Sequence, residues 1–165
     1  MLGAEVHSID VVDRNIAIAR HHADQTGLSI RYQTITAEAL AQQGSQYDVV
    51  LNMEVVEHVA DLPGFVRACA QLVRPGGIMF IATLNRTWLS WLTAIVGAEY
   101  VLRWLPKGTH RWRRFPKPAE LEALLVREGM TVVARRGVRV NPLTRRMALT
   151  RFMGVNYMLV FQKST

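Results

Sequence analysis

The chain has 165 residues, half of them apolar and a fifth charged, which is enough for one domain with a buried core. Its net charge of +7 is uneven: residues 1–85 carry five Lys/Arg against nine Asp/Glu, and residues 86–165 carry fifteen against four. An acidic half joined to a basic half points to a polyanionic surface, membrane or nucleic acid, near the second half. The single cysteine excludes an internal disulfide bond, and no uncharged apolar stretch approaches the ~20 residues of a membrane-spanning helix.

The first half alternates strand and helix signals. In chain order, the expected elements are a strand over 5–10, a helix over 13–26, a strand over 29–35, a helical turn over 36–41, a strand over 47–53, a helix over 62–73 and a strand over 78–84. Asp13 and Asp61 are the expected helix caps, and Gly27 suits a helix C′ position. The uninterrupted apolar strand 47–53 is typical of one buried on both faces. This order predicts an α/β fold with a doubly wound parallel sheet.

The alternation breaks between residues 85 and 117. This segment holds all four tryptophans and seven of the twenty basic residues. Regular patterning resumes with a helix over 118–128. Two strands follow, over 131–140 and 155–162, and we expect them to pair as an antiparallel edge.

Two acidic positions follow the first two strands, where ligands bind in an open α/β sheet. The carboxylate of Asp10 can accept hydrogen bonds from both hydroxyls of a nucleoside ribose, and a turn or helix-capping aspartate is the alternative. Ala37 and Glu38 follow the second strand, where a backbone N–H and a carboxylate can meet an adenine edge.

A third acidic position follows the strand over 47–53. Glu54, Glu57 and His58 are spaced i, i+3, i+4, so one helical turn would place them on one face. Two carboxylates and an imidazole offer ligands for a divalent ion, and Glu57 or His58 can instead act as a base. The alternative is a helix N-terminus whose acids favour the dipole, with the histidine packed on the sheet.

These residues belong to strings that resemble a known family. YDVVLNMEVVEHV, LVRPGG and IATLNRT are similar to class I S-adenosylmethionine-dependent methyltransferases. SWLTAIVGAEYVLRWLPKGTH, FPKPAEL, NPLT and VNYML are similar to bacterial ubiquinone-biosynthesis O-methyltransferases and their mitochondrial counterparts. The resemblance covers essentially the whole chain. It implies a Rossmann-like fold in a single methyltransferase domain over 1–165, with 85–117 as a helical insertion within it.

The resemblance also implies roles for the acidic positions. The implied cofactor is S-adenosylmethionine, contacted by Asp10, Ala37, Glu38 and Met53. A magnesium ion is implied at Glu54, Glu57 and His58, although the same Glu-His pair occurs in class I methyltransferases that use no metal. Glu57 and His58 are the expected catalytic residues, as the base that deprotonates a hydroxyl. The implied substrate is a polyprenylated catechol or hydroxyquinol, methylated on oxygen during ubiquinone biosynthesis.

In this family, the segment 85–117 is thought to meet the membrane. Its apolar helical face would comprise Trp88, Leu89, Trp91, Leu92, Ile95 and Val96. Its cations toward anionic headgroups would be Arg86, Arg103, Lys107, Arg111, Arg113 and Arg114. A helical lid packed on its own domain is the alternative. The expected location is cytoplasmic and peripheral, at the inner face of the bacterial cytoplasmic membrane, with other quinone-biosynthesis proteins as partners and no nucleic acid.

The chain departs from the family at its start. Class I methyltransferases carry a loop of the type D-x-G-x-G-x-G after their first strand, where glycine lets the backbone approach the cofactor. This chain has no such loop, and MLGAEV resembles the end of the helix that follows it. We therefore expect an N-terminally truncated fold in which the strands ending at Asp10 and Met53 pair directly or leave unpaired edges. Cofactor binding by this chain is expected to be impaired.

Three classes of protein are alternatives to a methyltransferase. A basic nucleic-acid-binding protein is disfavoured because the basic residues alternate with Trp and Leu and no recognition motif is present. A nicotinamide-dependent enzyme also needs a glycine fingerprint, and would not explain the segment 85–117. A catalytically dead scaffold at a lipid surface is not separated from an enzyme by the sequence.

Overall fold

The computed structural model describes residues 3–92, 112–141 and 146–165. The chain divides into two compact units, residues 1–45 and 46–165, and each is described by itself. Most of the expected insertion, including Ile95, Val96, Arg103, Lys107 and Arg111, lies outside the described residues.

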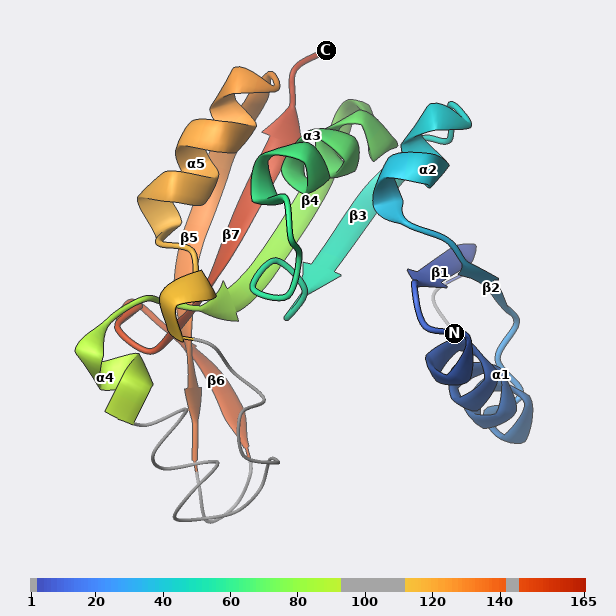
Figure 1. The fold of residues 1–165 in the computed structure, drawn as a ribbon, viewed down its shortest axis with the longest axis horizontal. Helices are drawn as coiled ribbons and strands as arrows, with labels where there is room; N and C mark the ends of the chain where they lie inside the picture. Colours follow the sequence, from blue (N-terminus) through green and yellow to red (C-terminus); the bar gives the residue numbers. More distant parts are fainter. Residues whose placement is uncertain (1–2, 93–111, 142–145) are drawn as a thin grey trace. The chain divides into compact units, whose positions relative to one another are not determined.

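The first unit is a small α/β layer (Figure 1). Its elements are β1 (Val6–Asp10), α1 (Asp13–Thr26), β2 (Ile30–Thr34) and α2 (Ala37–Gln42). The strands run parallel, with Asp10 opposite Thr34. These elements match the expected ones closely, and Gly27 takes the left-handed conformation that ends α1, with φ 64°. The expected cap is wrong, because α1 begins after Val12 and Asp13 lies in its first turn, where a negative charge favours the helix dipole.

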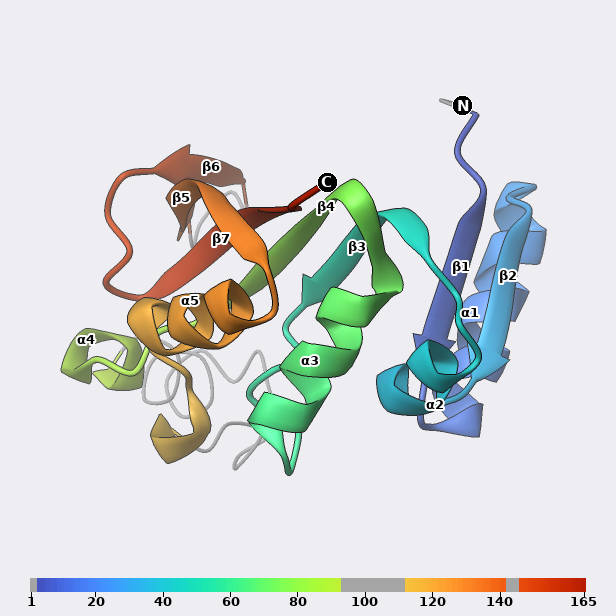
Figure 2. The same ribbon diagram turned by 90° about the horizontal axis from the view of Figure 1, so that it is seen from above.

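The second unit is a mixed sheet with helices on one face (Figure 2). Its elements are β3 (Tyr47–Met53), α3 (Leu62–Leu72), β4 (Val73–Leu84), α4 (Trp88–Ser90), the 3₁₀ helix η2 (Trp112–Arg114), α5 (Pro118–Arg127), β5 (Met130–Val140), β6 (Met147–Thr150) and β7 (Asn156–Lys163). The strand order is β3-β4-β7-β5-β6. The β3–β4 pair is parallel and the other pairs are antiparallel. Helices α3 and α5 lie side by side over the sheet.

The C-terminal strands refine the expected antiparallel edge. β5 and β7 do pair antiparallel, from Met130 opposite Lys163 to Arg136 opposite Met158. However, β7 lies inside the sheet between β4 and β5, and the edge is formed by β6. The sequence analysis missed β6, because this strand has four residues and no buried alternate face to produce a hydrophobic period.

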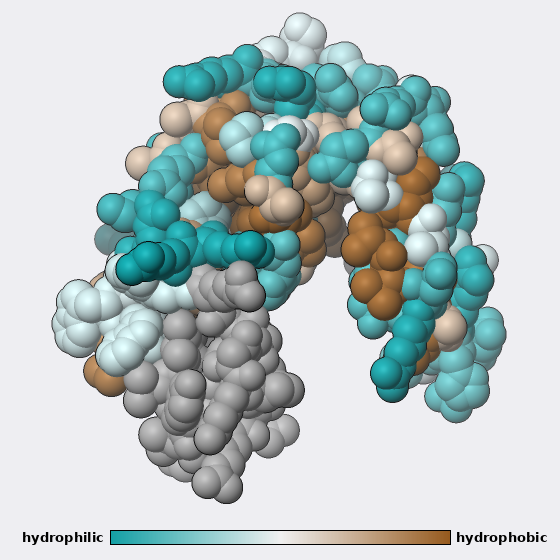
Figure 3. Space-filling view, viewed as in Figure 1, coloured by the Kyte–Doolittle hydropathy of each residue, from teal (hydrophilic) through white to brown (hydrophobic). Residues whose placement is uncertain are grey.

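The apolar strand β3 is not buried on both faces as expected. Val49 is 50% exposed and Leu51 is 68% exposed, and Figure 3 shows apolar surface over β3. Within the described residues β3 pairs only with β4, and β1 pairs only with β2. Within its own unit, each of these two strands therefore has one edge with which no described strand pairs.

The core of the second unit lies between the sheet and its two helices. Its largest fully buried side chains come from β4, η2–α5, β5 and β7: Met79, Ile81, Phe115, Leu121, Leu125, Met130, Tyr157, Leu159 and Phe161. Asp61 caps α3 as expected, accepting a 3.2 Å hydrogen bond from the Gly64 N–H. Lys163 donates to the carbonyls of Ala70 and Val73, at 2.8 Å each, so that a cation satisfies the C-terminal end of α3.

Candidate active site and family membership

In the first unit, Asp10 ends β1 and is held by local hydrogen bonds. Its Oδ1 accepts from the Val12 N–H at 2.8 Å, and its Oδ2 accepts from the Asn15 amide at 3.0 Å. Asp10 therefore acts as a turn aspartate, which was the alternative to a ribose-binding role. Each carboxylate oxygen has two lone pairs, so Asp10 retains capacity to accept from ribose hydroxyls.

The first unit brings the expected adenine-side residues to the same edge as Asp10. Ala37 and Glu38 open α2, immediately after β2, whose last residue Thr34 lies opposite Asp10. Thr36 caps this helix by accepting from the Ala39 N–H at 3.1 Å. The carboxyl ends of two adjacent parallel strands thus carry three of the four residues implied for the cofactor.

In the second unit, the residues after β3 do not form the expected helical turn. Met53 ends β3 and is 47% exposed. Glu54 then adopts a positive φ of 55°, and its N–H donates to the Ala82 carbonyl at 2.8 Å. The chain continues as a turn closed by the His58 N–H on the Val55 carbonyl at 2.9 Å. Because a left-handed residue interrupts a right-handed helix, Glu54, Glu57 and His58 do not line one helical face.

Glu57 is the buried centre of this turn. It is 3% exposed, and its Oε2 accepts a 2.6 Å hydrogen bond from the Thr83 hydroxyl. Its Oε1 accepts no hydrogen bond from the described residues, and lies 3.9 Å from His58 Nε2. The His58 side chain is 51% exposed. A buried carboxylate thus stands behind an accessible imidazole at the end of β3.

Glu54 lies beside the same carboxylate. Burial, repulsion from Glu57 and a hydrogen bond with Glu57 raise the pKa of Glu54 to about 8. Among the described residues, no three His, Cys, Asp or Glu side chains are grouped so that they could hold a metal ion. The arrangement of Glu54, Glu57 and His58 therefore does not fit a three-ligand magnesium site.

Two residues of this site were missed by the sequence analysis. Thr83 is fully buried inside an apolar strand, and Asn52 is 4% exposed inside another. Asn52 donates to the Cys69 sulfur at 3.7 Å, while its Oδ1 accepts no hydrogen bond from the described residues. A polar residue within a continuous apolar strand was the available signal, because buried polar groups need partners.

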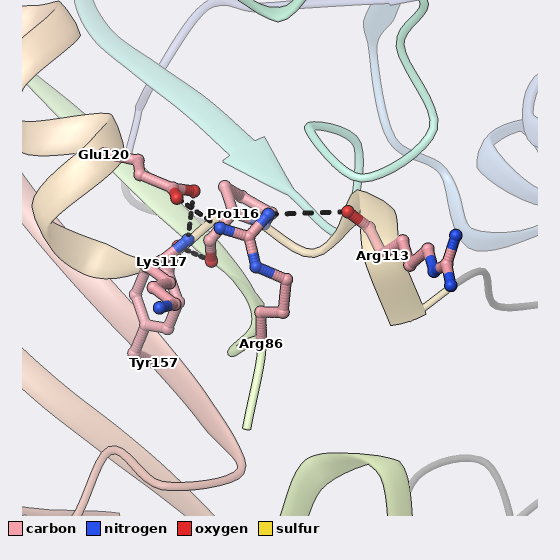
Figure 4. Close-up of polar contacts among 6 residues, drawn as sticks. All are labelled: Arg86, Arg113, Pro116, Lys117, Glu120 and Tyr157. Carbon is pink, nitrogen blue, oxygen red and sulfur yellow. Dashed lines mark hydrogen bonds and ion pairs between the residues drawn. The ribbon is translucent and has the colours of Figure 1, made fainter. Parts of the chain in front are cut away.

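The described ends of the segment 85–117 are fastened to the second unit by a polar cluster (Figure 4). Arg86 pairs with Glu120 of α5 and donates to the Arg113 carbonyl at 3.5 Å. The Tyr157 hydroxyl donates to the Pro116 carbonyl at 2.8 Å. The backbone N–H of Lys117 donates to Glu120 at 2.9 Å. Contacts with α5 and β7 thus fix both ends of the segment.

The first turn after this anchor is apolar and accessible. Trp88 is 72% exposed, Trp91 48% and Leu92 43%. Trp112 instead donates its indole N–H to the Thr87 carbonyl at 2.8 Å. Across the part of the chain that the structure describes, no helix is both long and apolar enough to cross a membrane.

The fold is shared with solved methyltransferases. The chain superposes on a magnesium protoporphyrin IX methyltransferase from Synechocystis PCC 6803, with a TM-score of 0.67, 16% identity, and coverage of 98% of this chain and 65% of the other. A methyltransferase from Methanosarcina mazei gives 0.69 and 16%, with 98% and 83% covered. A family model described as a methyltransferase domain matches residues 1–81. The fold is therefore that of the class I S-adenosylmethionine-dependent methyltransferases.

Relatives of higher identity share one more specific name. The chain is 51% identical over 163 residues to the ubiquinone biosynthesis O-methyltransferase of Bartonella tribocorum, covering 99% of this chain and 66% of the relative. It is 52% identical over 162 residues to that of Bartonella bacilliformis, covering 98% and 65%. Over nearly its whole length, the chain is thus similar to curated ubiquinone biosynthesis O-methyltransferases. It spans 65–66% of the length of these curated relatives.

Proposed function

We propose that this chain methylates a phenolic oxygen of a polyprenylated catechol or hydroxyquinol intermediate of ubiquinone biosynthesis, using S-adenosylmethionine. The observation that carries the proposal is the identity of 51% to a relative of that name over 99% of the chain. Glu57 and His58, a buried carboxylate behind an accessible imidazole at the end of β3, support it.

In this proposal His58 is the base and Glu57 its positioning residue. His58 takes the proton from the catechol hydroxyl, so that the oxygen becomes a phenolate nucleophile. The carboxylate of Glu57, held by Thr83 and 3.9 Å from His58 Nε2, stabilises the imidazolium that results. S-adenosylmethionine, when bound, supplies an electrophilic methyl group on a sulfonium. No step is assigned to a magnesium ion.

Four residues would contact the cofactor, and each role is proposed for its own unit. Asp10 would accept from the ribose hydroxyls, Ala37 and Glu38 would face the adenine, and Met53 would contact the cofactor from the end of β3. The partly free lone pairs of Asp10 and the exposure of Met53 are compatible with these roles.

We further propose that the protein works at the inner face of the cytoplasmic membrane, where an isoprenoid substrate resides. The exposed Trp88, Trp91 and Leu92 suit the headgroup boundary. Arg113 and Arg114 lie in η2, where the chain returns from the segment 93–111, and would add attraction to anionic lipid. Other quinone-biosynthesis proteins would be partners there.

The test is methyl transfer to a short-chain catechol at saturating S-adenosylmethionine, in one series with Mg²⁺ and in another with EDTA. We expect slow turnover by the chain, because the sequence has no glycine-rich loop. We expect the same rate with Mg²⁺ and with EDTA, because the residues after β3 are not grouped as metal ligands. His58→Ala is expected to lower the rate by about 10²-fold or more, and Arg14→Ala, an exposed residue of α1, to leave it unchanged. Absence of turnover above the uncatalysed rate would favour the non-catalytic scaffold.

A further inference from the structure

The edge strand β6 and the residue pair that follows it expose large apolar side chains. Met147 is 74% exposed, Leu149 66% and Phe152 60%. Met147 and Leu149 are two residues apart in a strand, so they lie on the same face. We call these three residues the β6 surface. Such a run of exposed apolar groups at one edge marks an interaction site.

Two glycines leave the space that Phe152 occupies. A side chain at Gly137 of β5 would overlap the Phe152 carbonyl oxygen, and a side chain at Gly154 would overlap the Phe152 ring. The hydroxyl of Thr87 donates to the Gly154 carbonyl, which joins this loop to the start of α4. The accessible Phe152 is therefore a packed feature of the fold.

The C-terminal stretch of the sequence that contains β6 carries charge of one sign. Residues 129–165 contain seven Lys/Arg and no Asp or Glu. Arg139 and Arg151 are exposed, and within the described residues neither forms an ion pair. Arg139 lies opposite Ala148 across the β5–β6 pair, so it projects from the face opposite to Leu149. The edge is thus apolar on the face of Met147 and Leu149, and carries Arg139 on the opposite face.

We propose that the β6 surface, with Arg139 and Arg151, docks on an anionic lipid surface as a second membrane contact, separate from the segment 85–117. Exposed apolar side chains would enter the headgroup boundary, while the long arginine side chains would reach lipid phosphates. The unpaired backbone edge of β6 would remain at the hydrated headgroup level, because bare hydrocarbon cannot satisfy it.

A second copy of the chain is the competing occupant of an edge strand that has only β5 as a partner among the described strands, and charge disfavours it. A two-fold antiparallel pairing centred on β6 would set Arg146 of one copy opposite Arg151 of the other. Like charges directly opposite destabilise a strand pair, and charged residues at an edge are a known protection against such pairing. The same positive charge attracts an anionic bilayer.

The test is sedimentation of the full chain with vesicles of phosphatidylcholine containing about one third phosphatidylglycerol, and with pure phosphatidylcholine. We expect wild-type binding to the anionic vesicles. Arg139→Gln with Arg151→Gln should weaken it about 30-fold, at roughly one kcal/mol per cation. Met147→Ser with Leu149→Ser should weaken it about tenfold or more.

A matched control lies at the other end of β5. Val126, 57% exposed, and Arg127 belong to α5, just before β5 begins, and β5 spans about 35 Å at its eleven residues. Val126→Ser with Arg127→Gln makes the same chemical changes away from the β6 surface and should leave vesicle binding unchanged. Circular dichroism of all variants verifies that they fold.

Several outcomes would overturn the proposal. The proposal fails if the wild-type chain does not bind anionic vesicles, or if both double variants at β6 bind them as tightly as wild type does. It also fails if the α5 control loses as much vesicle affinity as the β6 variants do. A wild-type dimer that the β6 changes convert to monomer, or displacement from vesicles by RNA, would assign the surface to another partner. Unchanged binding by the β6 variants alone would leave docking through 85–117 standing, and the methylation assay tests the proposed reaction independently.

Discussion

The hydroxyl of Thr83 donates a 2.6 Å hydrogen bond to Oε2 of Glu57, and the two residues are 0% and 3% exposed. This hydrogen bond joins the C-terminal end of β4 to the loop after β3. A buried carboxylate without such a donor would carry a large desolvation penalty. The Thr83–Glu57 contact therefore sets both the stability of the loop and the position of the carboxylate behind His58.

Replacing Thr83 by Val should destabilise the second unit by about 1–3 kcal/mol, because the carboxylate of Glu57 loses its hydroxyl donor without gaining water. Thr83→Ser keeps the hydroxyl and should cost only the lost methyl group, about 1 kcal/mol. Urea denaturation followed by circular dichroism measures both changes.

A double-mutant cycle isolates the contact itself. In a Glu57→Leu background the acceptor is gone, so Thr83→Val should cost less than about 0.5 kcal/mol. An equal cost of Thr83→Val in both backgrounds would show that packing of the threonine, and not its bond to Glu57, stabilises the loop.

The carboxyl of Glu54 should make stability depend on pH. Its pKa is raised from 4.5 to about 8, chiefly by burial and then by repulsion from Glu57. The folded chain thus holds this proton more tightly than the unfolded chain does. The stabilisation is complete below pH 4.5 and is lost as the pH rises from there to about 8.

Glu54→Gln mimics the protonated carboxyl and should flatten that decline, so the variant becomes more stable than wild type near pH 8 in buffer with EDTA. Glu57→Gln removes the repulsion but not the burial, and should shift the decline to lower pH. Urea unfolding midpoints measured between pH 4.5 and 8 test this prediction. A parallel decline of the midpoints of Glu54→Gln and wild type would contradict it.

Much of the fold could be predicted from local signals, and the site only in part. The bounds of α1 were predictable because periodicity and Gly27 report on the helix itself. The conformation of Glu54 was not, because its N–H bonds to Ala82, a partner 28 positions away in the sequence. Local spacing suggested a helical face there, and a strand contact overrode it.

The burial of β3 shows the same limit. Its apolar composition is that of a strand covered on both faces, yet Val49 and Leu51 are half or more exposed. The apolar composition of a strand indicates how much of it can be buried. The burial that is observed depends on which neighbouring elements are present. The sequence left open whether β1 and β3 pair directly or leave unpaired edges; within their own units, β1 pairs with β2 and β3 with β4.

We expect the purified chain to bind S-adenosylmethionine poorly. Its sequence has no glycine-rich loop through which a backbone could approach the cofactor, and β1 and β3 each leave an edge unpaired within the described residues. Titration calorimetry should give no signal at micromolar ligand. The relative from Bartonella tribocorum, 51% identical to this chain and longer, is the positive control. A micromolar dissociation constant for the 165-residue chain would refute this expectation.

Gly137 and Gly154 should respond differently to the same substitution. Gly154→Ala would drive a methyl group into the Phe152 ring, and Gly137→Ala would drive one into the Phe152 carbonyl oxygen. Each should cost about 1–3 kcal/mol in urea denaturation. In a Phe152→Ala background the ring is gone but the carbonyl remains, so the cost at Gly154 should largely vanish and the cost at Gly137 should persist. No relief at Gly154 would mean that the Phe152 ring is not packed on Gly154, and relief at Gly137 would mean that its cost does not come from the Phe152 carbonyl.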